Sequence, residues 1–451
     1  MSPLSRRSLL AALPALGFTA TARPAHARTA APPPDGRAGA VVAAFARACR
    51  PLRSTGPYGD LGDLRPLGAA IGDVPVVGLG EVAHGAHELF TLKHRVFRYL
   101  VEHKGFRTFA LEAGWGAGLR IDAYVRQGTG DPRTIMEEEF GNGKWPWHVH
   151  EYLDLITWMR EHNVRHPKSP VRFMGNDLAY PRIDDMLFER VLGYVGRRHP
   201  ALRPKFDGLY EALWAHAAET DFSALPPAER RRLAGLARQA VSILEGLRPG
   251  PDRAAYDRVV QHARVIEQTA TLLAFDLKDP ATWPEAMRYR DELMAWNTAW
   301  WYRHTGHKLL LSGHNGHTAY ETYDPAHYPV TQGAYLRKLL GEGGYLSVGT
   351  TFGRGSATVP GDDGKWRTEE FASPRAGSSE ELLERVGHET RYRDFLVDLR
   401  TVPSAARDWS HRARPTRDIG PPGDPYRPFA LGRGHDVLVH LHAFRAAHPL
   451  S

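Results

Sequence analysis

One stretch, Pro75 to Phe90, constrains the fold of this chain more than any other. Its sequence, PVVGLGEVAHGAHELF, begins as a short apolar run, and a carboxylate and two histidines follow the run. Val76 to Leu79 predicts a buried strand, which Gly80 ends just before Glu81. Open α/β sheets carry their sites beyond the carboxyl ends of their strands, so this order predicts the nucleus of a site in an α/β protein.

The same pattern recurs along the chain. Apolar runs at 108–111, 171–174 and 308–312 are followed by Glu112, by Asp177 and by His314, respectively. Further apolar runs at 345–351, 395–399 and 437–441 predict more strands, and amphipathic helical patterns lie between several of these runs. The sequence therefore predicts an α/β fold with a mainly parallel central sheet flanked by helices.

Strand signals disappear between residues 181 and 301. Apolar residues there keep a helical period, for example from Leu233 to Leu247 and from Tyr256 to Leu273. We expect a helical insertion over 181–301 that covers the carboxyl-terminal ends of the strands. The α/β core would then comprise residues 39–180 and 302–451, with a long Gly- and Pro-rich loop from Gly353 to Gly377.

The N-terminus has the features of a targeting signal. Arg6 and Arg7 precede a modestly apolar run, and Ala25-His26-Ala27 provides small residues around a cleavage point. This order predicts a twin-arginine export signal over residues 1–27, followed by a Pro-rich linker over 28–38. The expected location is extracellular or in the cell envelope.

Composition excludes several classes of partner. The formal net charge is +7, but lysines and arginines are spread along the chain and no basic block alternates with aromatic residues, so we expect no nucleic-acid partner. No later stretch is apolar over the roughly 18 residues that a membrane helix needs, so we expect no stable membrane insertion. Cys49 is the only cysteine, and its apolar neighbours predict ordinary packing rather than a reactive thiol.

The residues after the predicted strands suit acid and base chemistry. A histidine beside a carboxylate can act as a general base on water, because its pKa lies near the working pH and the carboxylate stabilises the imidazolium. His84 with Glu81 and Glu112 provides this pair, and His314 could polarise a carbonyl or protonate a leaving oxygen. Hydrolysis of an ester fits these groups.

Other chemistries remain open at this level. The pairs His84/His87 and His314/His317, with both glutamates, could hold zinc in a metal-dependent hydrolase, although no HExxH motif occurs. A non-catalytic protein that binds a small molecule on the same fold is another alternative. The pattern GLGEVA resembles a dinucleotide-binding turn, but Glu81 would repel a pyrophosphate there. No G-x-S-x-G motif occurs, which argues against a serine nucleophile.

Five blocks together resemble the erythromycin esterase family, which includes proteins named for succinoglycan biosynthesis. The resemblance covers roughly residues 70–440, and its blocks are GLGEVAHGAHELF (78–90), TFALEAGW (108–115), VRFMGNDLAY (171–180), YRDELMAWN (289–297) and LLLSGHNGHTAY (309–320). It implies an α/β core with a helical part and the hydrolysis of a macrolide lactone by histidine-activated water. It also implies that no cofactor or essential metal takes part.

The resemblance also implies roles for individual residues. His84 matches the general base, Glu81 and Glu112 its acidic partners, and His314 the histidine that assists at the carbonyl or leaving group. We assign the remaining polar residues of these blocks to substrate binding: His87, Glu88, Asp177, Arg290 and His317. The expected partner is a small-molecule ester or macrolide.

Overall fold

The computed structural model describes residues 35–141, 146–360, 366–420 and 424–450. The predicted export signal and residues 28–34 of the predicted linker lie outside the described residues. Helix α1 (Asp35–Ala48) begins inside the predicted linker, so the linker boundary at residue 38 was wrong. Val42 and Phe45 are buried against the core, and this packing stabilises the helix.

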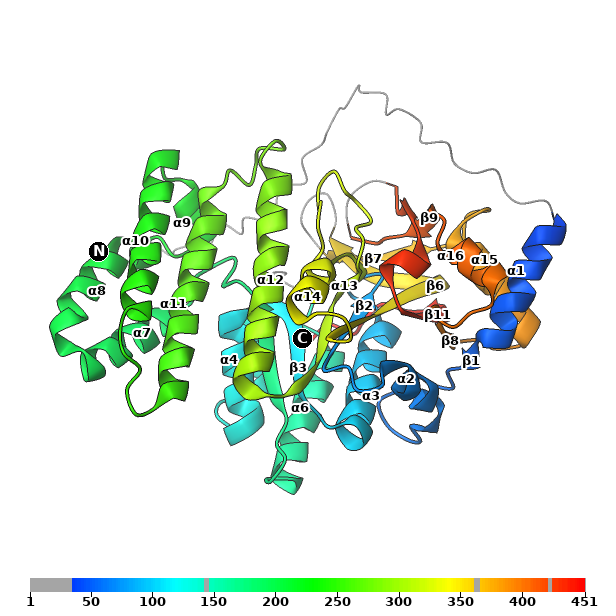
Figure 1. Ribbon diagram of the computed structural model, residues 1–451, viewed down its shortest axis with the longest axis horizontal. Helices are drawn as coiled ribbons and strands as arrows, with labels where there is room; N and C mark the ends of the chain where they lie inside the picture. The colour runs from blue at the N-terminus through cyan, green and yellow to red at the C-terminus, as the bar shows by residue number, and fades with distance from the viewer. Residues whose placement is uncertain (1–34, 142–145, 361–365, 421–423, 451) are drawn as a thin grey trace, which may run out of the picture.

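A nine-stranded sheet forms the centre of the described residues, in the order β1-β8-β11-β6-β2-β5-β3-β4, with β7 paired to β6 (Figure 1). The strands from β11 to β4 in this order run parallel, while β1, β7 and β8 pair antiparallel. This confirms the predicted α/β class with a mainly parallel sheet. The strands are β1 (Arg50–Pro51), β2 (Val76–Glu81), β3 (Phe106–Gly114), β4 (Arg172–Asp177), β5 (Lys308–His314), β6 (Tyr345–Pro360), β7 (Trp366–Phe371), β8 (Phe395–Asp398) and β11 (Val437–Phe444); β9 (Arg414–Arg417) and β10 (Tyr426–Phe429) form a separate pair.

Both faces of the sheet are covered by helices, which explains why the central strands are continuous apolar runs. Along β5, Leu310 packs into one hydrophobic cluster, whereas Leu309 and Leu311 pack into another on the opposite face. The first cluster includes residues of α3 and α6, and the second includes residues of α11, α12 and α14. The remaining helices and short 3-10 turns are η1 (Gly62–Leu64), α2 (Arg65–Ile71), α3 (His87–Lys104), α4 (Trp115–Gln127), α5 (Pro132–Phe140), α6 (His150–Arg165), α13 (Asn315–Thr318), α14 (Gln332–Leu340), α15 (Ser379–Thr390), α16 (Ser404–Ser410) and α17 (Leu431–Gly434).

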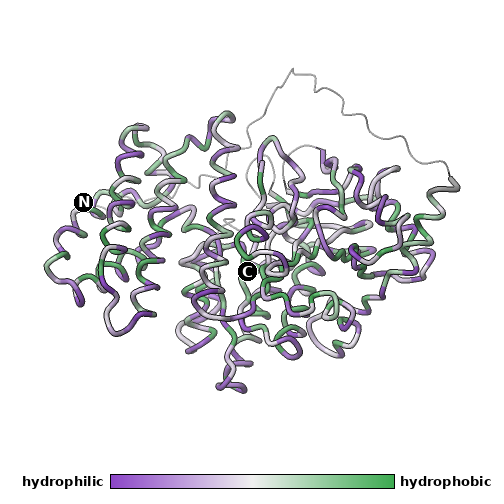
Figure 2. The backbone as a smooth tube through the Cα atoms, viewed as in Figure 1, coloured by the Kyte–Doolittle hydropathy of each residue, from purple (hydrophilic) through white to green (hydrophobic). Residues whose placement is uncertain are grey.

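Residues 185–305 fold as helices. They are α7 (Asp185–Arg198), η2 (Pro200–Leu202), α8 (Arg203–Ala215), α9 (Glu219–Ser223), α10 (Pro227–Glu245), α11 (Arg253–Ala274) and α12 (Trp283–Thr305). In Figure 1 helices α7 to α11 form a bundle at one end of the molecule, and α12 lies between this bundle and the sheet. Hydrophobic and hydrophilic stretches alternate along these helices, as amphipathic packing requires (Figure 2). Helix α12 is the element of this region that brings charged residues to the strand ends.

The predicted loop from Gly353 to Gly377 is partly a hairpin. Residues of β6 and β7 pair antiparallel from Gly355↔Phe371 to Pro360↔Trp366, so the prediction of a loop was wrong for these residues. Glycine and proline content hid a short alternating pattern in which Ala357 and Val359 are buried.

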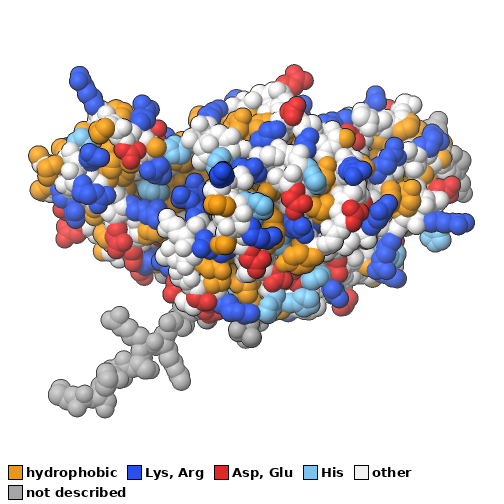
Figure 3. Space-filling model, turned by 90° about the horizontal axis from the view of Figure 1, so that it is seen from below, with side chains coloured by type: hydrophobic (Ala, Val, Ile, Leu, Met, Phe, Trp, Pro, Cys, Tyr) orange, Lys and Arg blue, Asp and Glu red, His pale blue; other side chains and the backbone are white. Residues whose placement is uncertain are grey.

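The remaining observations concern membrane-spanning helices, the charge of the surface and the single cysteine. None of the described helices is long and apolar enough to cross a membrane. On the face shown in Figure 3, basic side chains are interspersed with acidic and apolar ones.

Cys49 is buried, and this burial raises the pKa of its thiol to about 12. A protonated thiol is a poor nucleophile, which agrees with the packing role predicted for it.

Candidate active site

Polar residues from four adjacent strands meet at one edge of the sheet. Glu81 ends β2, His314 ends β5, Glu112 lies near the end of β3 and Asp177 ends β4, and these strands are neighbours in the order β2-β5-β3-β4. Glu81 and His314 are register partners across the β2–β5 pair. The parallel arrangement therefore brings together four of the residues that the sequence placed after separate strands.

His84 and Glu81 form a hydrogen-bonded pair just beyond β2. His84 Nδ1 lies 2.9 Å from Glu81 Oε1, and Glu81 is fully buried. Gly85 follows with a left-handed φ of 69°, and a Cβ there would lie 2.3 Å from the carbonyl oxygen of Thr358, so only glycine allows this turn. The other Glu81 oxygen forms an ion pair with Lys93 of α3. The carboxylate is thus held between the Lys93 amine, whose pKa burial lowers well below its usual range, and the imidazole.

The surroundings of His84 keep its ring neutral. Burial lowers the pKa of His84 to about 4, and this effect outweighs the opposing attraction of Glu112. Rings of Trp147 and His314 lie 5.1 Å and 5.0 Å from the imidazole, centroid to centroid. A neutral ring donates its Nδ1–H to Glu81, so the lone pair is on Nε2. Within the described residues no protein group hydrogen-bonds this Nε2, and 23% of the side chain is exposed.

Glu112 is the centre of a second, larger network of charges. Its Oε1 lies 3.2 Å from His317 Nε2 and 3.4 Å from a terminal nitrogen of Arg290, and its Oε2 accepts the backbone N–H of His314 at 2.8 Å. Burial raises the pKa of Glu112, but His317, together with His84 and Arg290, holds it well below its usual range. Glu112 is therefore a carboxylate at neutral pH.

His317 lies between two carboxylates and is a cation. Its Nδ1 lies 2.7 Å from Asp291 Oδ1, and its Nε2 faces Glu112. Burial lowers the pKa of His317, but Asp291 and Glu112 overcome this effect and raise it to about 10. With both nitrogens protonated and both hydrogens donated, this ring cannot accept a proton at neutral pH.

Arg290 joins the network to β4. Its Nε and one terminal nitrogen donate to Asp177 at distances between 2.5 and 3.2 Å, in the forked geometry that suits a guanidinium. Helix α12 supplies Arg290 and Asp291 from adjacent positions. The network holds three carboxylates against two cations, and its members are Glu112, Asp177, Asp291, Arg290 and His317. One negative charge is in excess beside His84.

His314 reaches the site, but both of its ring nitrogens are engaged. Nδ1 accepts the backbone N–H of Gly316 at 3.1 Å, and Nε2 donates to the carbonyl oxygen of Ile419 at 3.1 Å. Burial lowers the pKa of His314 to about 4, which agrees with a neutral ring of this tautomer. Its role at the carbonyl or leaving group stays a prediction, and it would require the ring to release one of these backbone partners.

His87 and Glu88 contact the C-terminal segment instead of the charged network. His87 Nδ1 lies 2.5 Å from Glu151 Oε1, and Glu88 accepts the backbone N–H of Arg445 at 2.8 Å. Their assignment to substrate binding stays a prediction that rests on sequence alone. The described residues also do not assemble the zinc set considered above, because His84 and His87 face different carboxylates.

One residue of the site, Lys93, escaped the sequence analysis although a signal was present, and Asp291 lay in one of the resembling blocks without a catalytic role assigned to it. Lys93 lies between Leu89 and Phe97 on the apolar stripe of α3, four positions from each, and is 1% exposed. Asp291 has the same relation to Met287 and Ala295 in α12. A charge at a position where the helical period demands an apolar residue marks a buried, paired group.

Two cavities lie away from these residues. One, of about 390 Å³, is lined by residues that include Tyr320, Arg337 and Arg433. Another of about 390 Å³ lies against α3 and α6 and is lined by residues that include Arg98 and His162. The ionisable groups described above line neither cavity, so the site is identified from its side-chain geometry.

Comparison with known proteins agrees with an esterase of this architecture. The sequence profile described as Erythromycin esterase matches residues 101–444. The erythromycin esterase type II of Escherichia coli is 24% identical over 389 residues, which cover 79% of this chain and 90% of that protein. Membership of this class supports esterase activity in general. The chain belongs to the erythromycin esterase family.

Two solved structures share the fold. A succinoglycan biosynthesis protein superposes with a TM-score of 0.81 at 27% identity, covering 91% of this chain and 98% of that one. An erythromycin esterase mutant in its open conformation superposes with a TM-score of 0.69 at 16% identity, covering 90% of this chain and 99% of that one. The predicted fold class and family resemblance are thus confirmed.

Proposed function

We propose that this protein hydrolyses a carboxylic ester or lactone with a water molecule that His84 activates. The observation that carries the proposal is the His84–Glu81 pair. The Nδ1 of His84 lies 2.9 Å from the buried Glu81 carboxylate, and the Nε2 of His84 has no hydrogen-bond partner among the described residues. A neutral imidazole fixed in this tautomer is the form that accepts a proton from water.

The reaction then follows ordinary acyl chemistry. His84 Nε2 removes a proton from water, and the water oxygen forms a bond to the carbonyl carbon of the ester. When the tetrahedral intermediate collapses, the bond from that carbon to the ester oxygen breaks. The imidazolium of His84 returns the proton to the departing oxygen, which yields an acid and an alcohol.

The charges around His84 support this cycle. The imidazolium appears only during the reaction, and Glu81 directly accepts its Nδ1–H. Within the neighbouring network, Glu112 raises the pKa of His84 against the larger effect of burial, and its attraction exceeds the opposing effects of His317 and of Arg290. The cation that forms in the reaction is therefore stabilised by fixed carboxylates that need no rearrangement.

A macrolide lactone is the substrate that we propose. The support is the family and the E. coli relative, whose name states erythromycin esterase activity. Lactone opening adds one water to the ring without releasing a second product. This product differs from its substrate by the mass of water, which makes the proposal simple to test.

We also propose that the protein is exported by the twin-arginine route. Its support is Arg6-Arg7 before an apolar run and the small residues Ala25 and Ala27. Expression with the native N-terminus should yield extracytoplasmic protein that lacks the signal, as measured by intact mass. A change of both arginines to lysine should leave the protein in the cytoplasm, whereas unchanged export would contradict this route.

The test of function is mass spectrometry of macrolides and simple esters incubated with the purified mature protein. We expect a macrolide to gain one water with the wild type and with His327→Ala, which removes an exposed histidine outside the charged network. We expect no gain with His84→Ala. Hydrolysis that survives in His84→Ala would refute the role of His84, and turnover of simple esters alone would refute the macrolide.

A further inference from the structure

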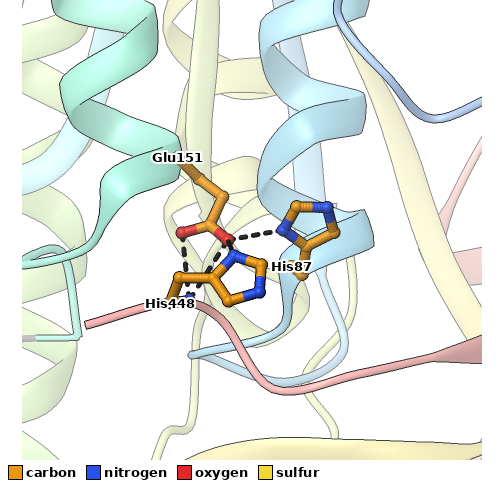
Figure 4. Close-up of side chains that lie close together, drawn as sticks. All are labelled: His87, Glu151 and His448. Atoms are coloured by element: carbon orange, nitrogen blue, oxygen red, sulfur yellow. Dashed lines mark hydrogen bonds and ion pairs between the residues drawn. The ribbon is translucent and has the colours of Figure 1, made fainter. Parts of the chain in front are cut away.

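A second group of histidine and glutamate side chains lies where three distant segments meet. His87 opens α3, Glu151 is the second residue of α6, and His448 belongs to the segment after β11. Figure 4 shows both imidazole rings turned towards the same carboxylate. Glu151 Oε1 lies 2.5 Å from His87 Nδ1 and 2.9 Å from His448 Nδ1.

Hydrogen bonds join the segments that carry these three side chains, and the Glu151 carboxylate takes part by accepting the backbone N–H of His448 at 3.2 and 3.3 Å. The N–H of His87 donates to the carbonyl oxygen of Arg445 at 2.8 Å, and the N–H of His150 donates to that of His448 at 2.8 Å. Ala447 also donates to Gly85 at 2.8 Å. The segment around His448 is thus bound to both helix starts, and the donor atoms are already positioned before any ligand binds.

The donor set is the one that divalent zinc prefers. Two imidazole nitrogens and one carboxylate oxygen, with a fourth position open to water, form a frequent zinc site with bonds of about 2.0–2.2 Å. A tetrahedral ion with such bonds spaces its ligands about 3.3 Å apart. The three donor atoms here all lie within 4.8 Å of one another, so shifts of about an ångström suffice.

We propose that His87, Glu151 and His448 bind one divalent metal ion of the zinc class. On binding, each ring carries its hydrogen on Nε2, and the two Nδ1 lone pairs and Glu151 Oε1 face the ion. The side chain of Glu151 is 2% exposed, whereas those of His87 and His448 are 21% and 55% exposed. The ion therefore has a buried anionic ligand on one side and access from solvent on the other.

This metal site is separate from the proposed hydrolytic centre. His84 pairs with Glu81, and neither residue shares a carboxylate with His87. The ion links the segment around His448 to the starts of α3 and α6, so its binding stabilises the fold. Metal binding and hydrolysis can therefore be tested independently.

The test uses tag-free protein that has been treated with a chelator and dialysed. Titration with Zn²⁺ in a calorimeter should give one tight site per chain in the wild type. His448→Ala should abolish this site, and the side chain that it removes is 55% exposed. The matched control is His327→Ala, because His327 is 59% exposed and also lies 2.9 Å from a carboxylate, that of Asp324.

Two further measurements use the same three proteins. Co²⁺ should give a visible absorption band in the wild type and in His327→Ala, but not in His448→Ala. Zn²⁺ should raise the melting temperature of the first two proteins and leave that of His448→Ala unchanged. Absence of a tight site in the wild type, or a site that persists in His448→Ala, would overturn the proposal.

Discussion

His84 and His317 lie in one site and differ in charge. Burial lowers the pKa of His84 to about 4, whereas two carboxylates raise the pKa of His317 to about 10. His317 has Asp291 at 2.7 Å and Glu112 at 3.2 Å on its two nitrogens. His84 contacts Glu81, which Lys93 also contacts, and the more distant attraction of Glu112 does not overcome the burial of the ring. The number of carboxylates in direct contact with a buried ring thus decides its charge.

The comparison gives the two histidines different functions. A neutral ring with one free nitrogen can take a proton from water, whereas a cationic ring whose two nitrogens both donate hydrogen bonds can only position its neighbours. His317 fixes Glu112, and Glu112 in turn accepts the N–H of His314 at the end of β5. The network around His317 therefore acts as a rigid, charged frame beside His84.

Glu81→Gln should have the largest effect on turnover, because it removes the carboxylate that orients His84 and stabilises its cation. We expect kcat to fall by about 10²–10⁴-fold, the range of a general base that is lost or misoriented. Glu81→Asp keeps the charge and should lose less. Steady-state kinetics on the substrate found by mass spectrometry measures both variants. Equal, small losses in the two variants would show that the charge of Glu81 is not needed.

Asp291→Asn should destabilise the fold by about 3–5 kcal/mol, because it breaks a buried network of ion pairs. The matched control is Asp324→Asn, which alters a histidine–aspartate pair of similar length at an exposed ring and should cost less than about 1 kcal/mol. Urea denaturation followed by circular dichroism gives both values. A cost for Asp291→Asn as small as that of the control would mean that His317 is not held as a cation.

The two histidines should weaken the fold at opposite ends of the pH scale. The pKa of His317 is raised in the folded state, so its contribution to the free energy of unfolding is complete below about 6.5 and is lost as pH rises through about 10. The pKa of His84 is lowered in the folded state, so the unfolded chain binds a proton at this ring before the folded protein does. The free energy of unfolding therefore falls as pH falls from about 6.5 through about 4.

Denaturation of the wild type and of His317→Gln between pH 6 and pH 10 separates the loss of stability caused by His317 from the loss caused by other titrating groups. The wild type should lose stability over this range, and the loss should be smaller in the variant. Identical slopes would contradict the raised pKa of His317.

Much of the fold could be predicted because local sequence patterns indicate its strands and helices. Apolar runs ending before Glu81, Glu112, Asp177 and His314 became the parallel strands β2, β3, β4 and β5. Central strands of a sheet covered on both faces must be apolar throughout, so they stand out in the sequence. The hairpin of β6 and β7 was missed because its buried positions alternate with glycine and polar residues.

The site was only partly predictable, because contacts between distant segments have no local signature. The sequence named His84 and His317 and the carboxylates of Glu81 and Glu112, but it did not show that Asp291 of α12 and Glu112 would both face His317 and make it a cation. Similarly, nothing around Glu151 indicated that His448, almost three hundred residues later, would face it. Lys93 could have been found as a charge on an apolar helix face, a pattern that Asp291 also shows.

The pH dependence of kcat/KM tests the central claim most directly, because it distinguishes the two histidines in one experiment. If neutral His84 is the base, kcat/KM should rise with unit slope up to about pH 4 and stay level through neutral pH, with circular dichroism confirming that the protein remains folded. An activity that rises only towards pH 10 would identify His317 as the base and contradict the account.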